Sequence, residues 1–195
     1  MSLACMGLRP RKLRATGQRR IRQEEIAMTF TITDYCDVQA RAEDLNLNRP
    51  EGLALLPRNF DTAAMRDELL HESAVQTVRL LFRENEIPER RVEPEGCKIP
   101  CIQENEFALI LPTLFVGSLL LSQNPHLLSL ALNVIANYAT DFFKGLPGRN
   151  KVVLDVVVED KNKKLSKKIH YDGGIDGLKE ITEIAGKVFT DETSH

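Results

Sequence analysis

Residues 106–144 have the sequence EFALILPTLFVGSLLLSQNPHLLSLALNVIANYATDFFK, and no other part of the chain has a comparable density of apolar side chains. Positions 107–121 contain no charged residue, and positions 127–143 contain only Asp141. A helix that is apolar on more than one face belongs either to the centre of a core or to a membrane. We therefore expect the rest of the fold to be arranged around this segment.

The second half of the segment has the signals of a helix start and a helix end. Asn124 is a suitable N-cap residue, and Pro125 suits the first helical position. Gly145 can adopt the left-handed conformation that ends a helix. These signals predict a helix that includes residues 127–143.

This helix is predicted to belong to a protein core, with Leu130 and Val134 buried. A membrane-spanning helix needs about 20 apolar residues, and both apolar parts of the segment are shorter than that. Three polar side chains give the helix one polar edge: Asn133, Asn137 and Asp141. A membrane-surface hairpin formed by residues 107–143 is the alternative.

The composition is that of a folded globular protein, because 43% of the 195 residues are hydrophobic and 28% are charged. The charges are unevenly distributed: residues 1–27 carry seven basic and two acidic side chains, whereas the rest carries 19 basic and 26 acidic ones. An acidic body does not attract nucleic acid. We expect residues 1–27 to be a disordered basic arm, with a nucleic-acid or targeting arm as the alternative, and residues 28–195 to be a single domain.

The four cysteines are too few and too scattered for a disulfide scaffold. The basic N-terminal segment is not followed by the apolar stretch of a secretory signal. Both observations favour a cytoplasmic location.

The first half of the predicted domain shows mainly helical patterns. Residues 34–47 fit a short helix, and residues 62–85 fit a long helix with Asp61 as its N-cap. Residues 86–106 are expected to form a loop, residues 107–111 fit a strand or a helix start, and residues 113–122 favour a helix. On the long helix, Arg79 is expected to face water, opposite a buried stripe of Leu70, Ala74, Val78 and Leu81.

The C-terminal part has the clearest pattern. Residues 152–158 alternate as a buried strand does, residues 160–164 form a turn, and residues 165–171 return as an edge strand. An amphipathic helix over residues 175–188 follows. We predict an α+β fold: a helical body with a central apolar helix, then a β-hairpin and a final helix within residues 151–190.

No catalytic, cofactor-binding or metal-binding residue is predicted. Cys97 and Cys101 could supply half of a zinc site, but no second Cys/His pair has ligand spacing. His71 and Glu72 begin a zinc-protease motif whose second histidine is replaced by Val75. The glycine-rich turn 172–177 matches no phosphate-binding pattern, and the lysines of residues 161–168 favour a solvated turn.

These patterns predict a cytosolic, non-enzymatic protein that acts through protein–protein contacts as a regulatory or adaptor subunit. Its partner would be another protein chain or a second copy in a homo-oligomer, and the folded domain would not bind nucleic acid. Two alternatives remain: a membrane-peripheral protein that uses residues 107–143, and a small enzyme. The enzyme would use Cys97, Cys101, His71 and Glu72.

Overall fold

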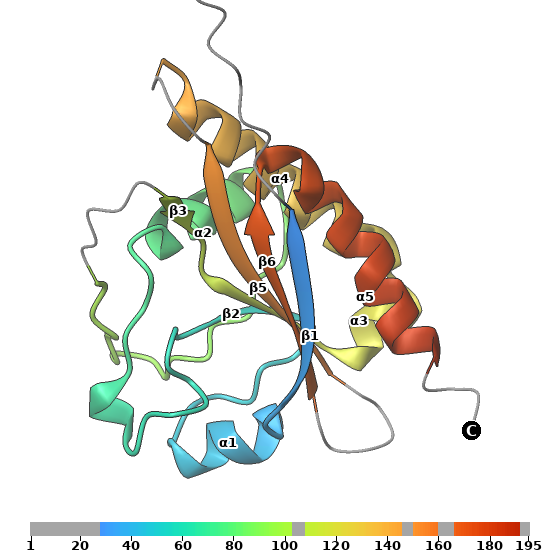
Figure 1. Ribbon diagram of the computed structural model, residues 1–195. Helices are drawn as coiled ribbons and strands as arrows, with labels where there is room; N and C mark the ends of the chain where they lie inside the picture. The colour runs from blue at the N-terminus through green and yellow to red at the C-terminus, as the bar shows by residue number, and fades with distance from the viewer. Residues whose placement is uncertain (1–27, 103–107, 146–149, 160–165, 192–195) are drawn as a thin grey trace, which may run out of the picture.

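The computed structural model describes residues 28–102, 108–145, 150–159 and 166–191 (Figure 1). The predicted basic arm 1–27 and the predicted turn 160–164 lie outside these residues. The described chain combines helices with a mixed sheet of six strands, so the predicted α+β class is confirmed.

The sheet is built around β5 (Lys151–Glu159). One edge of β5 pairs antiparallel with β6 (Ser166–Gly173), which pairs antiparallel with β1 (Thr29–Tyr35). The other edge of β5 has two parallel neighbours, β3 (Ala108–Ile110) beside its first half and β4 (Thr113–Val116) beside its second. Antiparallel to β4, β2 (Leu53–Leu56) completes the order β1-β6-β5-β4-β2.

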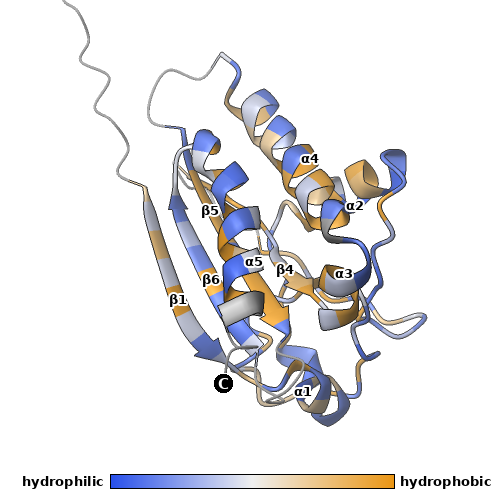
Figure 2. Cartoon of the chain, turned by 90° about the vertical axis from the view of Figure 1, so that its right-hand side faces the viewer, coloured by the Kyte–Doolittle hydropathy of each residue, from blue (hydrophilic) through white to orange (hydrophobic). Residues whose placement is uncertain are grey.

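Helices cover the two faces of this sheet unequally. One face is packed by α2 (Val75–Glu84), α3 (Ser118–Gln123), α4 (Pro125–Phe143) and α5 (Glu180–Asp191), which Figure 2 shows together on one side. The opposite face carries α1 (Val38–Asp44) and the loops between β2 and α2, which include the 3-10 turn Arg66–Glu68. A second 3-10 turn, Ile175–Lys179, leads into α5.

The alternating pattern of β5 divides its side chains between the two cores. Val152, Leu154, Val156 and Val158 face the helical side, and Val157 faces the side of α1. The predicted strand is therefore confirmed. The prediction that its partner strand lies at the sheet edge is wrong, because β1 pairs with β6 over seven consecutive residues. The alternation of β-branched residues in β1 was the signal for this strand.

Two helix predictions in the first half are wrong. Residues 62–74 form turns rather than the start of a long helix. The Asn59 side chain donates to the carbonyl of Glu68 and accepts from the amide of Leu70. These bonds hold Leu69 in the core beside α1. The predicted helix 113–122 is replaced by β4 and the shorter α3. The four side chains of β4 are all buried, which a strand beside β5 achieves and an exposed helix start does not.

The long helix α4 begins and ends where the sequence predicts, with Pro125 in its first turn and Gly145 left-handed at φ 82°. The side chain of Asn124 makes no capping hydrogen bond. Val134 is buried as predicted, but the prediction for Leu130 is wrong, since this side chain is 43% exposed on the same edge as Asn133. Within the described part of the chain, no helix is long and apolar enough to cross a membrane.

We expect Ile135→Ala to lower the free energy of unfolding by about 2–5 kcal/mol, because the side chain of Ile135 on α4 is fully buried in the core that α4 forms with the sheet. Leu130→Ala on the same helix is the matched control and should change it by no more than about 0.5 kcal/mol. Urea unfolding monitored by circular dichroism measures both values. Equal losses in the two variants would contradict this placement of α4.

Candidate functional site

A group of charged side chains lies buried where α2 meets the segment that follows it. Glu93 is at its centre: its Oε1 lies 2.6 Å from His71 Nε2, and Arg79 Nη2 donates to Oε1 at 2.8 Å and to Oε2 at 2.9 Å. Arg79 Nε also donates to Glu89 Oε1 at 3.2 Å. We call His71, Arg79, Glu89 and Glu93 the ionic cluster. It joins three stretches of chain that are separated in sequence.

The inward position of Arg79 contradicts the prediction that this side chain faces water. The buried face of α2 consists of Val75, Val78, Arg79 and Phe82, so the arginine lies on the apolar stripe itself. Leu70 and Ala74 of the predicted stripe precede α2, which begins at Val75. A basic residue at i+4 from Val75 and next to Val78 was the sequence signal for a buried ion pair.

The pKa values of the two carboxylates of the cluster are shifted in opposite directions. Burial favours the neutral form of Glu93, but the hydrogen bonds with His71 and Arg79 and the charge of Arg79 outweigh it and lower the pKa to about 2. Burial raises the pKa of Glu89, and the single contact with Arg79 only partly offsets this effect. Glu93 is therefore the permanent anion of the cluster.

His71 is held through one ring nitrogen. Its side chain is only 1% exposed, and its Nδ1 has no hydrogen-bond partner among the described residues. Backbone bonds fix the residue as well: its amide donates to Pro100 O at 2.8 Å, and its carbonyl accepts from Ile102 N at 2.9 Å. A ring so enclosed has no surface from which to reach a substrate in this conformation.

The structure separates most of the residues that the enzyme alternative combines. It brings the backbone of Cys101 beside His71, but the Cys101 side chain is exposed, and Cys97 is half-buried. Glu72 turns its carboxylate towards Arg58 Nε, 3.5 Å away. Across the described ranges, no group of three His, Cys, Asp or Glu side chains is arranged to hold a metal ion.

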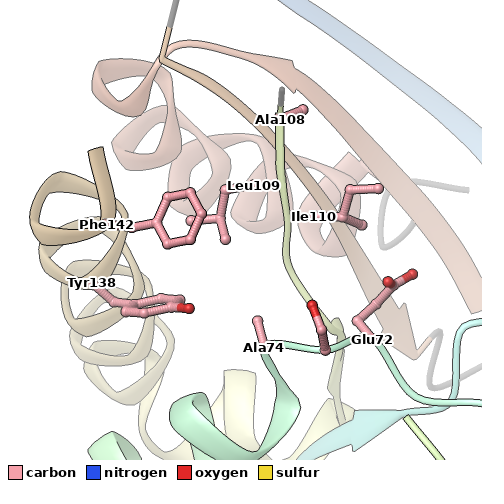
Figure 3. Close-up of a pocket in the computed structure, with 8 residues that line it drawn as sticks. Glu72, Ala74, Ala108, Leu109, Ile110, Tyr138 and Phe142 are labelled. Carbon is pink, nitrogen blue, oxygen red and sulfur yellow. The ribbon is translucent and has the colours of Figure 1, made fainter. Parts of the chain in front are cut away.

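A small pocket of about 150 Å³ opens between α4, the segment before α2 and β3 (Figure 3). Three consecutive residues of β3 line it, Ala108, Leu109 and Ile110. Alternate side chains of a strand point to opposite faces, so a wall made of consecutive residues exposes the edge of the strand to the pocket. The remaining lining residues are Glu72, Ser73, Ala74, Tyr138 and Phe142.

Two aromatic side chains of α4 form the apolar side of this pocket. The rings of Tyr138 and Phe142 meet edge to face with centroids 6.2 Å apart, as aromatic pairs prefer. Partial burial raises the pKa of the Tyr138 hydroxyl, and the nearby Thr77 side chain partly offsets this effect. Phe142 is 44% exposed. The pocket therefore combines the partly buried ring of Tyr138 with the ring of Phe142, which is open to solvent.

The remaining candidate segments have structural roles. In the glycine-rich turn, a Cβ atom at Gly173 or Gly177 would come within 2.6 Å or 2.4 Å of the Tyr171 hydroxyl, so these glycines make room for a buried ring. Asp172 pairs with Lys151 at 3.0 Å. Lys167 pairs with Asp34 on the neighbouring strand β1, rather than protecting a free edge. Lys168 lies 3.8 Å from Asp155, and the lysines at positions 161, 163 and 164 fall outside the described residues.

No protein-family model matches the sequence, and comparisons with curated proteins and with solved structures find no significant match.

Arg79→Met should lower the free energy of unfolding by about 3–5 kcal/mol, because it leaves buried Glu93 and Glu89 without their cation. Arg83→Met, one turn further along α2 and exposed, is the matched control and should cost no more than about 0.5 kcal/mol. Urea unfolding at neutral pH measures the difference. Similar small losses for both variants would show that the cluster does not depend on Arg79.

Protonation of Glu93 should make the protein less stable in acid. Its pKa is lowered from 4.5 to about 2, so its stabilisation is complete above pH 4.5 and disappears as the pH falls towards 2, a loss on the order of 3 kcal/mol. The raised pKa of Glu89 acts above this window. Unfolding free energies measured between pH 5 and pH 2 should therefore decline less steeply in Glu93→Gln than in the unmodified chain. Parallel curves would contradict this assignment.

Proposed function

We propose that this protein is a cytosolic, non-enzymatic adaptor or regulatory subunit that binds an extended segment of a partner protein along β3. The observation that carries the proposal is the strand edge in the wall of the pocket: β3 pairs with β5 and with no second strand among the described residues. Unpaired backbone groups at a strand edge are a ready template for a further strand.

The lining of the pocket suits this mode of recognition. In strand addition, main-chain hydrogen bonds supply affinity, and a pocket for an alternate side chain supplies specificity. Cofactor and small-molecule sites usually enclose about 300–1,000 Å³, whereas this pocket encloses about 150 Å³. It fits a single apolar side chain against Tyr138 and Phe142.

The ionic cluster supports a non-enzymatic role. Its histidine is buried, and both carboxylates are engaged by Arg79. Such a group stabilises the wall of the pocket, since His71 and Glu93 anchor the chain next to Glu72, Ser73 and Ala74. The cysteines in the described residues, Cys36, Cys97 and Cys101, are all free thiols, which favours a reducing compartment.

Selection of a random-peptide phage library on the full chain, followed by binding measurements on the enriched peptides, tests this function. Phe142→Ala should weaken peptide binding by about tenfold or more, as the loss of an aromatic anchor does. Leu130→Ala is the matched control, since it lies on the same helix and is 43% exposed against 44% for Phe142. Hydrogen exchange of Ala108, Leu109 and Ile110 should slow when peptide is bound.

Three results would contradict the proposal: peptides that bind equally well to Phe142→Ala, peptides that are lost with Leu130→Ala instead, and protection that maps away from β3. Co-sedimentation of the full chain with anionic phospholipid vesicles tests the membrane-peripheral alternative. Vesicle binding that Phe142→Ala removes, without any peptide binding, would replace the proposed partner segment by a membrane surface.

A further inference from the structure

A second free strand edge lies on the opposite side of β5 from the pocket. Strand β1 ends the sheet, with β6 as its single strand neighbour in the described part of the chain, and Figure 2 shows it as the outermost strand. The other end is closed differently: the four residues of β2 are all buried, and Arg90 N donates to Leu53 O at 2.8 Å. Only β1 presents a long, solvent-exposed edge among the described strands.

The usual devices that protect an edge strand are missing from β1. It has no proline, no lysine and no bulge over its seven residues, and its register with β6 is continuous. Its single charged residue, Asp34, is paired with Lys167 of the same chain. At its centre, Ile32 is 49% exposed on the face that carries the helices. The strand therefore leaves both backbone groups and an apolar side chain uncovered.

From these features we infer that β1 pairs with β1 of a second copy of this chain, antiparallel and about a two-fold axis at Ile32. This proposal concerns a different surface from the pocket and does not depend on it. In an antiparallel pair, directly opposite residues point to the same face of the sheet. A change of register must therefore keep the apolar side chains of both copies on the same face. Centring on Ile32 is the one symmetric register that pairs all seven residues of the strand.

The side chains of β1 are self-complementary in this register. Ile32 meets Ile32 of the second copy, which buries the exposed apolar side chain on the helical face. On the other face Thr31 lies opposite Thr33 of the second copy, a favourable cross-strand pair. The two Asp34 side chains stand four residues apart along the joined strands, which is about 13 Å. This separation exceeds the screening length of about 8 Å in physiological salt.

The dimer would join two six-stranded sheets into one of twelve strands. A contact made by one pair of strands is small, and interfaces of this kind are weak and reversible. We therefore expect a dissociation constant in the micromolar range or weaker.

Sedimentation equilibrium of the full chain over about 1–500 µM tests the inference. We expect a concentration-dependent shift from 22.0 kDa to twice that mass. Ile32→Lys places like charges directly opposite each other and should raise the dissociation constant about tenfold or more. Leu119→Lys is the control, because Leu119 on α3 is the most exposed large apolar residue in the described part of the chain, at 60%. It should leave the association unchanged.

A second variant tests the register without weakening the fold. Ile32→Cys should form an intermolecular disulfide under mild oxidation, because its two copies would face each other at the short distance that a disulfide bridges. Thr33→Cys, whose own copies are offset in this register, and Met65→Cys, on an exposed loop, should cross-link far more slowly. A chain that stays monomeric up to the highest concentration would overturn the inference. So would a dimer that survives Ile32→Lys, or equal cross-linking of the three cysteine variants.

Discussion

The burial of β5, complete on its helical face and partial on the opposite one, is the constraint on which the rest of the structure depends. A strand of nine residues with valines on both faces needs two apolar surfaces and paired backbone groups on both edges. Helices α4 and α5 cover one face, and α1 with its neighbouring loops covers the other. Strands β6, β4 and β3 satisfy the backbone. The long apolar segment 108–143 is divided by this requirement, since its first part supplies two strands and its second part a covering helix.

Dividing that segment also creates the edge at which we place partner binding. On one edge of β5, β3 pairs with the first half and β4 with the second half. Only Leu111 and Pro112 separate β3 from β4. Strand β4 is covered in turn by β2, whereas β3 is not covered by a further strand in the described residues. The pocket lies at this discontinuity, between the unpaired edge of β3 and the aromatic residues of α4.

The ionic cluster connects stability to the shape of the pocket. Arg79 lies on the buried stripe of α2 and compensates the charge of two carboxylates whose pKa values burial raises. A buried ion pair contributes little net stability compared with apolar packing, but it strongly disfavours arrangements in which either partner is left alone. The cluster therefore fixes one relative position of α2, the segment around Glu93 and the pocket wall at Glu72.

The sequence by itself determined the elements whose pattern is local. The alternation in β5, the apolar side chains of α4 between Pro125 and Gly145, and the apolar stripe of the last helix all extend over enough residues to identify each element. It also predicted the α+β class.

Tertiary structure decided what depends on contacts between distant segments. Whether residues 113–116 form a strand or a helix depends on β5, some 40 residues later, and β6 became an inner strand only because β1 pairs with it. The same holds for Arg79, whose burial requires Glu93 to neutralise it. A short apolar run or a single charge has no periodicity of its own, so its partner across the fold determines its conformation and its environment.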